Sequence, residues 1–100
     1  MLTELDTNNF ENEIKTGLKL VEFYTDWCGY CKKQKPELEE LNKVWIGQVE
    51  ADRNPQIAAK YNVNAFPTFL IFKNGKDVER FSGFRKKEDL MQRIMKHLQN

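Results

Sequence analysis

The sequence has no excess of either charge and no long apolar run. Its 100 residues include 16 basic and 15 acidic side chains, a net charge of +1. This balance argues against a general attraction to nucleic acid or to an anionic membrane. No stretch approaches the roughly 18 apolar residues that a membrane span needs. We therefore expect neither a nucleic-acid partner nor a membrane partner.

No signal peptide is expected at the start of this sequence, because the segment from Met1 to Phe10 carries Glu4 and Asp6 and has no apolar run. We therefore expect a cytoplasmic protein. A chain of 100 residues can bury one hydrophobic core and leaves little room for a second module. Residues 1–100 are accordingly expected to form a single domain.

Helix and strand signals alternate along the chain. The sequence Asn74-Gly75 is typical of a two-residue hairpin turn. A strand–helix–strand unit followed by a hairpin predicts an α/β fold with a central mixed sheet and helices on both faces. Spacing and capping residues predict helices at about 10–16, 28–44, 55–61 and 86–98, and strands at 18–24, 45–51, 68–72 and 77–82.

The chain has only two cysteines, Cys28 and Cys31, separated by two residues. A disulfide across so short a loop would constrain the unfolded chain very little, so the pair is a poor structural crosslink. Redox chemistry or metal binding is the more usual meaning of such spacing. Three alternatives stay open on these residues alone. They are half of a zinc site with His97, a zinc or iron–sulfur site shared between two copies, and inert core thiols.

The position of the pair favours redox chemistry, because it follows a predicted strand and opens a predicted helix. The first turn of a helix has unpaired N–H groups and a partial positive charge, which lower the pKa of a thiol placed there. We expect Cys28 to be the exposed, attacking thiol and Cys31 the more covered, resolving thiol. Gly29 between them keeps the turn open to a substrate.

Five features of the sequence, in order, resemble the thioredoxin family. The resemblance covers nearly the whole chain and implies the thioredoxin fold. It also implies an enzyme that reduces protein disulfides, with Cys28 attacking and Cys31 resolving. No metal or organic cofactor is expected, and the implied form is a monomer reduced again by a thioredoxin-reductase-like protein. The features are Trp27-Cys28-Gly29-Tyr30-Cys31-Lys32, Pro36, Phe66-Pro67-Thr68, Phe72-Lys73-Asn74-Gly75 and Gly83.

The resemblance also implies a substrate groove beside the cysteines. Pro67 matches the cis-proline that shapes this groove, and Phe66 matches the residue whose backbone pairs with the substrate. Gly83 matches the glycine on the far side of the groove. Trp27 and Phe66 would be apolar walls beside the sulfur atoms.

Glu22 lies in an apolar strand, six residues before Cys28. The family usually has a buried aspartate there, which accepts a proton from the resolving cysteine. Burial would raise the pKa of Glu22, which suits proton transfer near neutral pH. Since strand faces alternate, a solvent-facing glutamate remains the alternative. Gln48 stands where many members have a lysine, so one influence that would lower this pKa is missing.

Tyr30 stands where thioredoxins usually carry proline. The dipeptide Gly29-Tyr30 is similar to that of some bacterial periplasmic disulfide isomerases, which implies a more oxidising couple. The alternatives are therefore a disulfide isomerase or oxidase, and a non-catalytic binding module of the same fold. Gly29 and Tyr30 belong to the expected substrate-binding surface.

Overall fold

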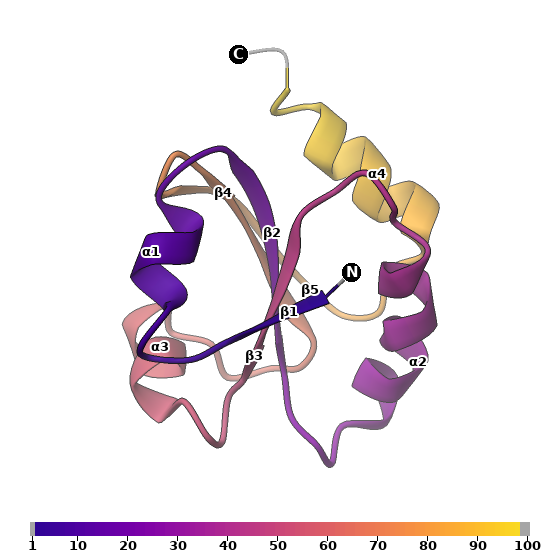
Figure 1. Ribbon diagram of the computed structural model, residues 1–100. Coiled ribbons are helices and arrows are strands. Elements are labelled where there is room, and N and C mark those ends of the chain that lie inside the picture. The colour runs from indigo at the N-terminus through magenta and orange to yellow at the C-terminus, as the bar shows by residue number, and fades with distance from the viewer. Residues whose placement is uncertain (1, 99–100) are drawn as a thin grey trace.

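The computed structural model describes residues 2–98, which form a central sheet with helices on both of its faces (Figure 1). Helices α1 and α3 cover one face, and α2 and α4 cover the other. The predicted α/β arrangement with a mixed sheet is confirmed. The elements in chain order are β1 (Leu2–Leu5), α1 (Phe10–Ile14), β2 (Leu18–Tyr24), α2 (Gly29–Glu39), β3 (Ile46–Glu50), α3 (Pro55–Lys60), β4 (Thr68–Lys73), β5 (Lys76–Ser82) and α4 (Lys87–Met95).

The strand order in the sheet is β1-β3-β2-β4-β5. Strand β3 pairs in parallel with β1 and with β2, whereas β4 pairs antiparallel with β2 and with β5. Strand β2 is therefore central and is covered on both faces. The register places Glu22 opposite Gln48 of β3 and opposite Phe69 of β4. The end of this central strand leads directly into the turn before α2.

Two hydrophobic clusters, one on each face of the sheet, form the core. Burial of this apolar surface is the dominant favourable term in folding. The cluster under α1 and α3 contains Phe10, Ile14, Phe23, Ile57, Leu70 and Phe72 among others, and the cluster under α2 and α4 contains Leu20, Leu38, Ile46, Phe69, Leu90 and Ile94 among others.

The Asn74-Gly75 hairpin prediction is confirmed. Both residues have positive φ, 52° and 86°, as a two-residue hairpin turn requires. The turn is also tied to the loop before β2, because the side chain of Asn74 accepts a bond from the amide of Gly17 at 2.8 Å. The amide of Asn74 donates in return to the carbonyl of Gly17 at 2.9 Å.

Some predicted boundaries were wrong. Strand β1 was not predicted, and it adds an edge to the sheet beside β3. Helix α2 ends at Glu39 rather than near Val44, and α4 ends at Met95. Leu41 lies in the loop that follows α2 and is buried there, so its burial does not depend on the helix. Leu98 lies beyond α4 and is 64% exposed.

Candidate active site

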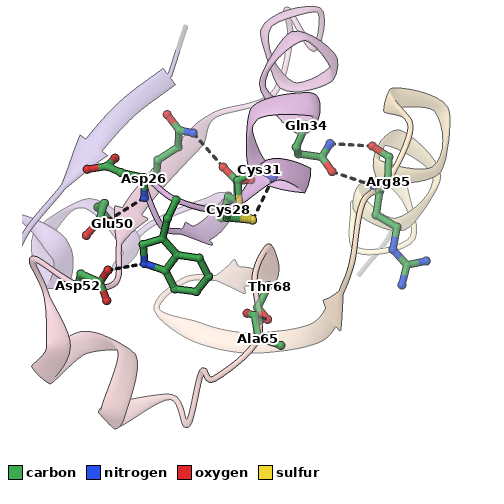
Figure 2. The surroundings of a disulfide bond; sticks show 12 residues. Asp26, Cys28, Cys31, Gln34, Glu50, Asp52, Ala65, Thr68 and Arg85 are labelled. Carbon is green, nitrogen blue, oxygen red and sulfur yellow. Dashed lines mark hydrogen bonds between the residues drawn. A yellow bond between two sulfur atoms is a disulfide. The ribbon is translucent and has the colours of Figure 1, made fainter.

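The cysteine pair lies at the start of α2, where it forms a disulfide with a Cα–Cα distance of 5.3 Å (Figure 2). Cys28 is the N-cap residue of α2, and the amide of Cys31 points at its sulfur atom, 3.1 Å away. A backbone N–H and the positive end of a helix thus face Cys28 Sγ. Both favour negative charge on this sulfur once the disulfide is reduced.

The expected difference in exposure between the two cysteines is not found. Cys28 is 6% exposed and Cys31 is 7% exposed. Both cysteines are thus buried in the oxidised protein. What distinguishes the cysteines here is their surroundings, because Cys28 receives the N–H group whereas Cys31 lines a cavity that also contains Glu22.

Trp27 and Tyr30 form an exposed aromatic surface next to the disulfide, with 69% and 65% of their surface accessible. The indole N–H of Trp27 donates to Asp52 at 2.8 Å. The edge of its ring meets Phe66, with 6.0 Å between the ring centroids. An exposed aromatic ring held in place as Trp27 is can bury apolar surface of a bound polypeptide at little entropic cost.

The turn between β2 and α2 is held by Glu50, a carboxylate that the sequence analysis did not identify. Glu50 is 1% exposed and accepts bonds from the backbone amides of Asp26 at 3.1 Å and of Arg53 at 2.7 Å. The side chains of Asp26 and Arg53 also form an ion pair at 2.6 Å. The signal available in the sequence was an acidic residue at the end of an apolar strand. In the structure this residue stabilises the turn that carries Trp27.

The structure joins Pro67 and Gly83, the two residues expected on opposite sides of the groove. The Phe66–Pro67 peptide bond is cis, and the carbonyl of Pro67 accepts a bond from the amide of Gly83 at 2.8 Å. Gly83 has a φ of 93°, a conformation that side chains rarely adopt. The hydroxyl of Thr68 donates to the carbonyl of Ala65 at 2.6 Å, and this bond spans the cis peptide.

Glu22 is buried, with 1% of its surface exposed, so the solvent-facing alternative is wrong. Gln48 donates to Glu22 Oε1 at 2.9 Å, while Oε2 has no hydrogen-bond partner. Burial raises the pKa of Glu22 to about 7, the bond from Gln48 opposes this rise, and the charge of Glu4 adds to it. Glu22 and Cys31 line one cavity of about 210 Å³. This volume exceeds the ~30 Å³ that one water molecule occupies, so the cavity has room for water.

Glu4 and Tyr24 line the same cavity. The hydroxyl of Tyr24 donates to Glu4 at 3.0 Å. Burial, together with this bond, raises the pKa of Tyr24 to about 12, and burial also raises the pKa of Glu4. The sequence alone does not predict this contact, because it depends on β1, which brings Glu4 beside the central strands.

Within residues 2–98 no group of three or more histidine, cysteine or acidic side chains is arranged to hold a metal ion. In the same part of the chain no helix has the length and apolar character to cross a membrane.

Known proteins resemble this chain over nearly all of its length. A family model described as Thioredoxin matches residues 1–96. A thioredoxin of Staphylococcus epidermidis is 40% identical over 97% of this chain and 98% of its own length. A thioredoxin of Chlamydia trachomatis is 41% identical over 97% of this chain and 99% of its own length. The crystal structure of a Fasciola hepatica thioredoxin superposes with a TM-score of 0.83 at 38% identity and covers 95% of this chain and 98% of its own.

Proposed function

The chain belongs to the thioredoxin family and is a thiol–disulfide oxidoreductase of that family, and we propose that it reduces protein disulfides with Cys28 as the attacking thiol and Cys31 as the resolving thiol. The observation that carries this assignment is the amide of Cys31 directed at Cys28 Sγ from the first turn of α2. This arrangement favours the thiolate on Cys28 and leaves Cys31 beside the buried acid.

In the first step, the Cys28 thiolate attacks one sulfur of the substrate disulfide. A mixed disulfide forms, and the other substrate sulfur leaves as a thiolate that takes a proton from solvent. Trp27, Tyr30, Phe66, Pro67 and Gly83 would contact the polypeptide around the attacked disulfide. Gly29 has no atom within 4 Å of where a Cβ would lie, so the space beside this first residue of α2 is open.

In the second step, Glu22 accepts the proton of the Cys31 thiol. The Cys31 sulfur then attacks Cys28, the Cys28–Cys31 disulfide forms, and the second substrate sulfur leaves. Two electrons pass from the cysteine pair to the substrate. Support for the role of Glu22 comes from its burial, its pKa of about 7 and the cavity it shares with Cys31. An acid whose pKa lies near the working pH is well suited to this transfer.

The family implies disulfide-containing substrates and a reductase in general terms. For this chain we propose a thioredoxin-reductase-like electron donor, a cytoplasmic location and a monomeric form in which residues 1–100 are one domain. The cysteine pair is the redox group of the reaction, and the proposed steps require no metal or organic cofactor.

Insulin reduction tests the proposed function directly. The protein should accelerate precipitation of the insulin B chain with dithiothreitol as electron donor, and also with a thioredoxin reductase and its nucleotide. Cys28→Ser should abolish the acceleration. Wild-type protein that is inactive with both donors would instead support a non-catalytic binding module.

A further inference from the structure

Gln34 is a fully buried polar residue, one turn beyond Cys31 on the inner face of α2. Its side-chain amide makes two bonds to one residue. Nε2 donates to the carbonyl of Arg85 at 2.7 Å, and Oε1 accepts from the amide of Arg85 at 2.8 Å. Figure 2 shows both bonds crossing from α2 to the segment before α4. A buried amide whose two partners belong to a single residue fixes the place of that residue, because leaving any of these groups unpaired is costly.

Arg85 is held from its other side as well. Its guanidinium donates to the carbonyl of Ser82 at 2.8 Å and pairs with Asp89 at 3.4 Å. The first contact ties Arg85 to the end of β5, and the second ties it to the first turn of α4. Gln34 adds a tie to the helix that carries the cysteines. The segment from Gly83 to Arg85 is thereby fixed to three elements.

Together with the Cys28–Cys31 disulfide, these contacts form a closed ring of residues that includes the cysteine pair. Each member either follows its neighbour closely in the chain or touches it through a contact already described. Passing around the ring from Cys31, the members are Gln34, Arg85, Gly83, Pro67, Phe66, Trp27 and Cys28. The two hydrogen bonds of the Gln34 side-chain amide join helix α2 to the Gly83–Arg85 segment. Lys33, whose ammonium lies 4.7 Å from the ring centroid of Phe84, makes a weaker parallel contact.

We propose that Gln34 is a positioning residue for polypeptide substrates, which holds the Gly83–Arg85 segment at a fixed place relative to the cysteines. This inference rests on the proposed function. An extended polypeptide that flanks a disulfide contacts both sides of the ring, so its alignment with Cys28 depends on the position of this segment. A small disulfide needs contact only with the sulfur atoms. Gln34 therefore acts on the reaction with proteins and not on the thiol chemistry itself.

Helix α2 offers a matched control one turn further on. Glu37 Oε1 accepts a bond from the backbone amide of Lys87 at 2.7 Å. This bond also joins α2 to a backbone group, but it reaches the start of α4, outside the ring. Gln34→Met and Glu37→Met each replace a side chain of α2 that bonds to backbone with an apolar one of similar length. They differ in which segment they release.

The experiment measures second-order rate constants for the reduced protein with insulin and with the small disulfide 5,5′-dithiobis(2-nitrobenzoate), by stopped flow. For Gln34→Met we expect the constant for insulin to fall about tenfold, since modest misplacement of a substrate costs one to two orders of magnitude. The constant for the small disulfide should stay within about twofold of wild type by the same argument. Glu37→Met should change neither constant.

Gln34→Asn provides a second variant that retains an amide but is one methylene too short for both bonds. It should show the same selective loss if Gln34→Met does not fold. Equal losses on both disulfides would overturn the inference, because they would mean that Gln34 supports the cysteines themselves. Unchanged constants for both folded variants would also overturn it, because the segment would then be fixed without Gln34. A wild-type protein inactive towards both disulfides would instead refute the proposed function.

Discussion

Glu22→Gln should remove a pH dependence of stability that the buried carboxylate causes. The pKa of Glu22 is raised by burial from 4.5 to about 7, and the side chain is 1% exposed. Between these two pH values the native state holds a proton that the unfolded chain has already released. Because the unfolded state binds fewer protons there, the free energy of unfolding falls as the pH rises through this window.

The size of this effect follows from the same two values. At ~1.4 kcal/mol per pH unit, the interval from 4.5 to about 7 corresponds to a loss on the order of 3 kcal/mol. Glu22→Gln cannot lose this proton, so its stability relative to wild type should rise by about that amount between roughly pH 4.5 and pH 8. Any fixed cost of the buried amide is the same at every pH and cancels in this comparison.

Urea unfolding of the oxidised protein at a series of pH values measures this difference, with the cysteines kept from titrating by their disulfide. Glu39→Gln, which removes an exposed carboxylate of α2, is the matched control and should follow the wild-type profile. Parallel profiles for wild type and Glu22→Gln would refute the argument, because Glu22 would then titrate alike in the folded and unfolded states.

Three further predictions concern the same region. Gln48→Lys should lower the pKa of Glu22 by about 1–3 units, since a cation would replace a neutral donor, and carboxyl NMR shifts would report it. Gly83→Ala should lower the free energy of unfolding by about 1–3 kcal/mol, measured in urea, because φ is 93° and no neighbouring atom would clash with the added Cβ. The control Gly29→Ala, in a helix, should not destabilise the protein. Tyr30→Pro should make the redox potential of the cysteine pair more negative by on the order of 30 mV, which is a tenfold change in its equilibrium constant with glutathione. An unchanged potential would contradict the role given to Tyr30.

Local sequence signals predicted most elements but not their partners. Strand β2 and the hairpin were found because apolar β-rich residues and the Asn74-Gly75 turn act locally. Strand β1 was missed because it has four residues, mixes polar and apolar side chains, and gains its stability from parallel pairing with β3, far along the chain. The end of α2 was placed too late because Leu41 keeps the helical spacing but lies in the loop after the helix, where it is buried.

The site was predicted as far as single motifs reach. Alternation along a strand left the orientation of Glu22 open, and the structure decides it because β2 is central and covered on both faces. Gln34 went unnoticed although the spacing of Cys31, Gln34 and Leu38 puts a polar residue on the buried face of α2. That pattern says that a buried partner exists, but only the fold shows that the partner is the backbone of Arg85.

The central claim is that Cys28 attacks and Cys31 resolves, and trapping of the mixed disulfide tests it most directly. Reduced Cys31→Ser and Cys28→Ser would each be mixed with insulin, quenched with acid and analysed by mass spectrometry. Cys31→Ser should accumulate a covalent adduct with an insulin chain, because Cys28 can attack but nothing resolves the product. Cys28→Ser should show no adduct over the same time. An adduct that forms faster with Cys28→Ser, or equally fast with both variants, would contradict the assignment.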